Sequence, residues 1–180
     1  YTETLAAIME KLSIKISKEI SLEPIAQEYL NDIFVNFTPQ VIKYLPLLKP
    51  SGKIEDTQKF IDSAKEAIKN NINYSWVILK NQKFIGCCGI REINTDIGDF
   101  GYWIKTEEQG KGIGKLIAKT VFDWSFKNCD IQKIKYPVDK SNIPSVKIIE
   151  SLGGKIFSSY KTGQEECLDV NEYHIKKNSW

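Results

Sequence analysis

Residues 101–117 read GYWIKTEEQGKGIGKLI and place three glycines between two different patterns. The aromatic run before the glycines is typical of a strand, and the apolar residues after them recur at helical spacing. A glycine-rich turn between a strand and a helix leaves backbone N–H groups unblocked at the positive end of the helix. Lys111 and Lys115 add positive charge. The stretch therefore predicts an anion site, most naturally for a phosphate or a pyrophosphate.

The two common nucleotide-binding patterns do not fit this loop. A Walker loop needs four residues between its first glycine and the Gly-Lys pair, followed by Ser or Thr. Here three residues separate Gly110 from Gly114, and Leu116 follows Lys115. The dinucleotide pattern G-x-G-x-x-G is missed as well, because the spacing is G-x-G-x-G. The loop therefore predicts a phosphate-containing ligand that is bound by neither of these two motifs.

Strand and helix patterns alternate on both sides of the loop, which predicts a mixed sheet with helices packed on it. No repeat or linker interrupts the chain, so we expect one domain over residues 1–180. The expected strands are 11–18, 75–79, 83–90, 99–104, 133–139, 155–160 and 169–177. The expected helices are 22–37, a short one ending near residue 45, 55–70, one from 113 to about 124, and 141–154.

The composition sets broad limits on function. The chain has 180 residues, of which 42% are hydrophobic and 27% charged, as in a soluble globular protein. Its net charge of +2 indicates no strong preference for nucleic acid or membrane. No apolar run is long enough to span a bilayer, and no secretory signal opens the sequence. The four cysteines suit neither a zinc site nor a redox pair, so we expect reduced thiols, no metal and a cytoplasmic location.

Two separate motifs resemble those of one enzyme family. Gln109, Gly112 and Gly114 match motif A of the GCN5-related N-acetyltransferases, Q/R-x-x-G-x-G/A. The stretch NIPSVKIIESLGG, residues 142–154, resembles motif B of that family through Asn142, Ser145 and Gly153. The runs KFIGCCGIREIN and GDFGYWI look like the central hairpin of the family. The chain is most similar to the branch that contains RimJ and RimL.

The resemblance implies an α/β fold, called α+β in some schemes. The sheet would be mixed, mostly antiparallel and six- to seven-stranded, flanked by helices. It would splay between its fourth and fifth strands, here 99–104 and 133–139.

The resemblance also implies transfer of an acetyl group from acetyl-CoA to a primary amine by direct attack. A backbone N–H near Ile104 would polarise the thioester carbonyl. The acceptor would be a protein N-terminal α-amine or a small-molecule amine, and residues 38–53 would line its side of the site. The protein would act as a monomer or a homodimer. The expected cofactor-binding residues are Ile104, Lys105, Thr106, Gln109, Gly110, Lys111, Gly112, Ile113, Gly114, Lys115, Asn142 and Ser145.

The catalytic side chains are less well defined by the sequence. Many members of the family carry a tyrosine as general acid where this chain has Ile149. Ser145 is a candidate donor to the leaving thiolate, or else an ordinary serine in the first turn of a helix. The alternative function is a non-catalytic domain that binds acyl-CoA and regulates another protein.

Five glutamates are candidates for the base that deprotonates the acceptor. We select Glu92, at a strand end, and Glu165, between the last two strands, although Gln164 could occupy the position of the latter. For the pair that opens the glycine loop we expect a structural or solvated role. The five candidates are Glu92, Glu107, Glu108, Glu165 and Glu166.

Overall fold

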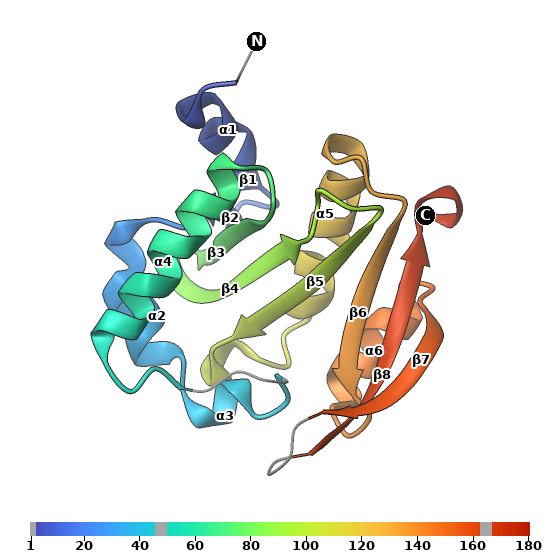
Figure 1. Cartoon of the computed structure of the whole chain (residues 1–180). Helices are drawn as coiled ribbons and strands as arrows, with labels where there is room; N and C mark the ends of the chain where they lie inside the picture. Colours follow the sequence, from blue (N-terminus) through green and yellow to red (C-terminus); the bar gives the residue numbers. More distant parts are fainter. Residues whose placement is uncertain (1–2, 46–49, 163–166) are drawn as a thin grey trace.

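The computed structural model describes residues 3–45, 50–162 and 167–180, which form one eight-stranded sheet with helices on both faces (Figure 1). The strand order is β1-β2-β3-β4-β5-β6-β8-β7, and only the β5–β6 pair is parallel. The strands are β1 Ile14–Lys15, β2 Ile20–Pro24, β3 Tyr74–Lys80, β4 Lys83–Arg91, β5 Ile97–Ile104, β6 Lys133–Asp139, β7 Lys155–Thr162 and β8 Leu168–Lys176. The mixed, mostly antiparallel sheet is confirmed, with one strand more than the upper expectation.

The helices are α1 Leu5–Leu12, α2 Leu30–Asn36, α3 Pro39–Ile42, α4 Ile54–Lys69, α5 Ile113–Asn128 and α6 Ile143–Ser151. Short 3₁₀ turns cover Gln27–Tyr29, Thr106–Glu108 and Lys177–Ser179. In the part of the chain that the structure describes, none of the helices has the length and apolar character that a bilayer crossing demands.

The expected strand at 11–18 is correct only at β1, Ile14–Lys15. The Thr4 side chain accepts a hydrogen bond from the N–H of Ala7 and caps α1, which buries Ile8 and Leu12 one turn apart. The strand that follows, β1, is only two residues long. The Ser17 hydroxyl then accepts hydrogen bonds from the N–H groups of Glu19 and Ile20 and turns the chain into β2. The alternating pattern therefore includes a helix end and a turn.

The expected helix at 22–37 is correct only in its second half. Leu22 and Ile25 are fully buried, and β2 pairs with β3 from Ile20↔Lys80 to Pro24↔Trp76. Proline has no N–H to donate to a neighbouring strand. Because β1 pairs with only two residues of β2, no strand lies beside Pro24 on that side, and the missing N–H leaves no hydrogen bond unmade. The helix itself begins at Leu30. The other expected elements agree with the structure to within a few residues at their ends.

Alternate residues of β5 contact opposite helical layers. The Phe100 ring packs edge-on against Phe122 of α5, with ring centroids 5.1 Å apart. The Trp103 ring lies 5.3 Å from Phe37, directly after α2. Figure 1 shows α2 and α4 over one half of the sheet, with α5 and α6 behind it. We call the Trp103 side the front face and the Phe100 side the back face.

The centre of the sheet is tightly buried. Trp76 is completely buried, and its Nε1–H donates to the carbonyl of Leu12 at 2.7 Å. The adjacent Cys87 and Cys88 lie in β4, each 6% exposed, and successive residues of a strand point to opposite faces. Burial raises the pKa of both thiols. Cys167, by contrast, is exposed.

Candidate functional site

The sheet opens between β5 and β6. These strands pair only from Ile97↔Lys133 to Asp99↔Lys135, and the remaining five residues of β5 have no partner in β6. Figure 1 shows the two strands diverging from that point into a V. The predicted splay is therefore confirmed, and it lies between strands 99–104 and 133–139 as the resemblance implied.

The open half of β5 presents backbone amides to this gap. The Lys105 N–H donates to the Ile85 carbonyl of β4 at 2.8 Å. Because backbone groups alternate in direction along an antiparallel strand, those of Tyr102 and Ile104 point the other way, toward β6. The Ile104 carbonyl accepts a hydrogen bond from Gln109 Nε2 at 2.8 Å. The N–H groups of Tyr102 and Ile104 are thus available to an extended ligand lying in the gap.

The glycine loop lies at the mouth of the same gap. Gly110 and Gly112 adopt left-handed φ angles of 75° and 78°, and no atom lies within 4 Å of where a Cβ would be. Helix α5 begins directly afterwards at Ile113, and no described side chain caps its first N–H groups. Gly114 is different, because a Cβ there would lie 3.1 Å from the Tyr102 hydroxyl. The loop joins a helix N-terminus to the free strand.

Glu108 is held by two lysines. Its Oε2 atom lies 2.9 Å from Lys80 Nζ and 3.1 Å from Lys111 Nζ. Hydrogen bonds from these two ammonium groups lower the pKa of the Glu108 carboxyl. Lys80 and Lys111 also line a small hollow of about 240 Å³ beside Gly112. Glu108 thus holds cationic side chains beside the loop.

The first turn of α6 brings a serine against a tyrosine. The Asn142 side chain caps the helix by accepting from the Ser145 N–H at 3.5 Å. Ser145 is 6% exposed, and its Oγ lies 2.6 Å from the Tyr136 hydroxyl of β6. Ile149 is fully buried one turn later. The two sequence motifs meet where α5 packs on α6, since a Cβ at Gly114 would lie 3.0 Å from Ile148 Cδ1, and the position of the expected tyrosine is part of the core.

Asp99 was not among the residues expected from the sequence. It is 7% exposed and stands where the β5–β6 ladder ends. One oxygen, Oδ2, pairs with Arg91, while Oδ1 is buried and has no partner among the described residues. Burial raises the pKa of the Asp99 carboxyl, although Arg91 and Lys135 act in the opposite direction. A buried carboxylate oxygen without a partner is unusual enough to indicate a function.

The front face beside Asp99 is open. Gly101 points to the same face two residues further along β5, is exposed, and has no atom within 4 Å of a Cβ position. An acceptor lying over Gly101 would thus be close to both Asp99 and the free amide of Tyr102. An acidic residue inside an otherwise apolar strand was the only sequence signal for Asp99.

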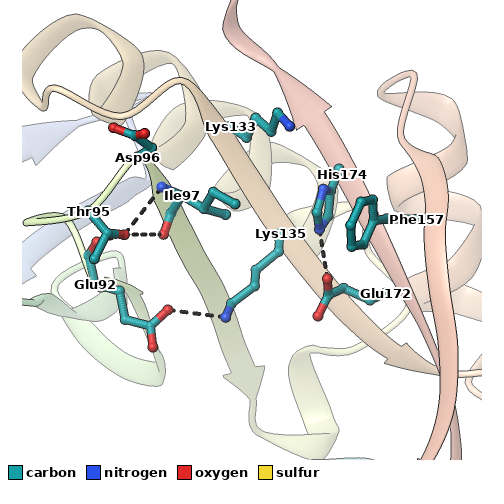
Figure 2. A pocket seen from close by; sticks show the side chains of 9 residues that line it. All are labelled: Glu92, Thr95, Asp96, Ile97, Lys133, Lys135, Phe157, Glu172 and His174. Atoms are coloured by element: carbon teal, nitrogen blue, oxygen red, sulfur yellow. Dashed lines mark hydrogen bonds and ion pairs between the residues drawn. The ribbon is translucent and has the colours of Figure 1, made fainter.

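Glu92 lies at the closed end of the V. Its carboxylate is 3.1 Å from Lys135 Nζ, and it borders a hollow of about 440 Å³ on the front face (Figure 2). The only histidine, His174, lines the same hollow, where its Nε2 is 2.7 Å from Glu172 and its ring stacks on Phe157 with centroids 4.1 Å apart.

The structure does not describe two groups of the residues expected from the sequence. Glu165, Glu166 and Gln164 lie outside the described residues, as does part of the segment 38–53. Within residues 3–45, 50–162 and 167–180, no three His, Cys, Asp or Glu side chains gather as a metal site requires.

Comparisons with known proteins agree with this geometry. The model of the acetyltransferase (GNAT) domain matches residues 19–155. An uncharacterized N-acetyltransferase, p20 of Bacillus licheniformis, is 24% identical over 150 residues, which are 79% of this chain and 83% of that protein.

Two of the solved structures that share the fold are acetyltransferases with bound coenzyme A. RimL, a ribosomal L7/L12 α-N-protein acetyltransferase in complex with coenzyme A, superposes with a TM-score of 0.82 at 16% identity and covers 91% of this chain and 97% of its own. Spermidine N-acetyltransferase of Vibrio cholerae, in complex with CoA and spermine, has a TM-score of 0.78 at 20% identity, covering 90% and 98%.

Proposed function

The chain belongs to the GNAT acetyltransferase family, and we propose on this premise that it transfers an acetyl group from acetyl-CoA to a primary amine by direct attack. One observation carries the proposal: a single gap in the sheet combines an open glycine loop at a helix N-terminus with unpaired strand amides. Acetyl-CoA has matching parts, since an anionic pyrophosphate precedes an extended arm that contains two amides and ends in the thioester.

The loop supplies the pyrophosphate site in this proposal. The N–H groups from Gln109 to Lys115 surround the start of α5, where the helix dipole favours an anion, although that of Gln109 is already donated to the Thr106 carbonyl. Open space at Gly110 and Gly112 lets the backbone approach phosphate oxygens closely. Lys111 and Lys115 add charge. The pantetheine arm would then run along residues 104–106, although the Lys105 N–H is already donated to Ile85.

The acyl group would lie deeper in the V. The free N–H of Tyr102 or Ile104 would donate to the thioester carbonyl and stabilise the oxyanion that forms when the amine attacks. Collapse of this intermediate breaks the carbon–sulfur bond and leaves the electron pair on sulfur. Ser145, in the first turn of α6, would give its hydroxyl proton to the thiolate.

Asp99 is the base that we propose for the acceptor. Its Oδ1 is buried without a partner at the edge of the open surface over Gly101, and its pKa is raised by burial. A carboxylate with a raised pKa takes a proton more readily at neutral pH. Glu92, paired to Lys135 at the closed end, and Glu165 stay as predictions.

The modest strength of this base favours an acceptor of low pKa. Deprotonating an α-amino group of pKa about 7.7–8.0 at pH 7 costs about 1–1.4 kcal/mol, whereas a lysine of pKa about 10.4 costs about 4.6 kcal/mol. We therefore propose a protein N-terminal α-amine or a small-molecule amine as the acceptor. Among the fold neighbours, RimL is named for an α-N-protein substrate and another enzyme for spermidine.

The test is thiol release from acetyl-CoA in the presence of N-terminal peptides, polyamines, amino acids and aminoglycosides. We expect acceptor-dependent release with an α-amine or another low-pKa amine as the best acceptor. Preference for a lysine side chain would contradict the acceptor argument. Tight acetyl-CoA binding without release across the whole panel would instead support the non-catalytic acyl-CoA-binding alternative.

A further inference from the structure

Three side chains that carry hydroxyl groups gather on the back face of the sheet beside the V. Ser145 Oγ is 2.6 Å from the Tyr136 hydroxyl, and both residues are buried. The Tyr136 ring and the half-buried Tyr102 ring both stack on Phe100, with centroids 5.7 and 5.8 Å away. The Tyr102 hydroxyl lies next to Gly114 at the start of α5. The three hydroxyls thus lead from the glycine loop to the first turn of α6.

The direction of the Tyr136–Ser145 hydrogen bond matters for chemistry. A phenol is a better donor than an aliphatic alcohol, so the Tyr136 hydroxyl is the natural donor and Ser145 Oγ the acceptor. The serine keeps its own proton for another partner in that arrangement. Burial and the neighbouring Tyr102 raise the pKa of Tyr136, which keeps it protonated as a donor.

A second buried tyrosine, Tyr173, offers a comparison, because it contacts α6 away from Ser145. Tyr173 faces Tyr136 across the β6–β8 ladder, and its hydroxyl also reaches α6. It donates to Glu150 Oε1 at 3.1 Å, more than one helical turn beyond Ser145. Both tyrosines lie on paired strands and contact α6, but only Tyr136 contacts Ser145.

We propose that Tyr136 is a positioning residue that orients Ser145 and resupplies its proton when Ser145 protonates the leaving thiolate, replacing the tyrosine that is absent at Ile149. This inference rests on the proposed acetyl transfer. As the carbon–sulfur bond breaks, its electron pair stays on sulfur, which takes the Ser145 proton. Ser145 takes the Tyr136 proton, Tyr136 takes that of Tyr102, and water at the half-buried Tyr102 returns the last proton. The proton that the attacking nitrogen loses as it becomes an amide neutralises the hydroxide that this leaves, so no net proton is consumed.

The experiment compares the variants Ser145→Ala, Tyr136→Phe and the double variant with Tyr173→Phe as the matched control. The rate constant kcat and the KM for acetyl-CoA are measured with the best acceptor. We expect kcat to fall about 100-fold for Ser145→Ala, within the usual range for losing a general acid, and about 10-fold for Tyr136→Phe. KM for acetyl-CoA should stay within about twofold, and Tyr173→Phe should keep the wild-type kcat.

The double variant separates a relay from independent packing effects. If Tyr136 acts through Ser145, the double variant loses no more than Ser145→Ala alone, whereas independent effects multiply to about 1,000-fold. Should Tyr136→Phe not fold, Tyr102→Phe provides a second variant, for which a smaller loss of kcat is expected.

The failures of the two proposals can be told apart. A wild-type protein that releases no thiol with any acceptor contradicts the proposed function. A wild-type protein that turns over, with an unchanged kcat in Tyr136→Phe or multiplicative losses in the double variant, overturns the relay alone.

Discussion

Replacing Gly112 by alanine tests the glycine loop directly, because the substitution adds one methyl group at a left-handed position. A non-glycine residue in this conformation costs about 1–2 kcal/mol. Alanine also restricts the unfolded chain, which offsets about 0.4–1 kcal/mol. With no atom within 4 Å of the new Cβ, no clash is added. The free energy of unfolding should therefore fall by about 1 kcal/mol.

Binding should suffer more than folding. If the loop holds pyrophosphate, the methyl group enters the space of the ligand and displaces at least one backbone donor. A hydrogen bond to a charged group is worth about 1.5–3 kcal/mol. The dissociation constant for acetyl-CoA should then rise at least about tenfold. Titration calorimetry measures the affinity, and urea unfolding measures the stability.

Gly153 offers a matched control for this substitution. It has a φ of 87° and, like Gly112, no atom within 4 Å of a Cβ position. It follows the C-terminal end of α6, about 12 Å along the helix from Ser145. Gly153→Ala should lose a similar free energy of unfolding and keep the wild-type acetyl-CoA affinity. Equal acetyl-CoA affinity in the two variants would refute the pyrophosphate site.

Three further substitutions test the base, an ion pair and the core. Asp99→Asn should keep acetyl-CoA affinity, lower kcat/KM about 100-fold and remove the acidic limb of the pH–rate profile; an unchanged profile would exclude Asp99 as the base. The lowered pKa of Glu108 means that its contribution to folding is complete above its unfolded pKa of about 4.3 and is lost as the pH falls through the folded value. Urea midpoints of Glu108→Gln should therefore lie below wild type at pH 6 and converge with it in acid, and a gap independent of pH would contradict this. Trp76→Phe leaves the buried Leu12 carbonyl without its donor and should cost about 2–4 kcal/mol in urea unfolding, whereas Trp180→Phe, on the surface, should cost less than about 1 kcal/mol; equal losses would contradict the burial argument.

Sequence patterns predicted the parts of the fold whose signals are local. The glycine loop, the helix from Ile113 and the hairpin around Cys87 each depend on residues close together in the chain. The N-terminal region was predicted wrongly because Leu12 fits an alternating strand pattern and also pairs with Ile8 on a helix. Only packing against Trp76, 64 residues later, distinguishes the two.

The functional side chains also divide into those with a local sequence signal and those that depend on contacts between distant residues. The position of Ser145 followed from a motif, but its contact with Tyr136 depends on how β6 and α6 fold back on each other. Asp99 could not be predicted, because its burial arises where β6 joins β5, 36 residues along the chain at Lys135. A lone acidic residue in a strand gives no indication of whether it will be exposed or enclosed.

The two adjacent buried thiols of β4 can report how often the sheet opens in the native protein. A thiol reagent in water can react with Cys87 or Cys88 only after β4 separates from its neighbours, whereas Cys167 is exposed from the start. In the intact wild-type chain, labelling should therefore be fast at Cys167 and slow at Cys87 and Cys88, with the half-buried Cys129 as a separate class. Because opening of a central strand approaches global unfolding, the slow class reports stability without any denaturant.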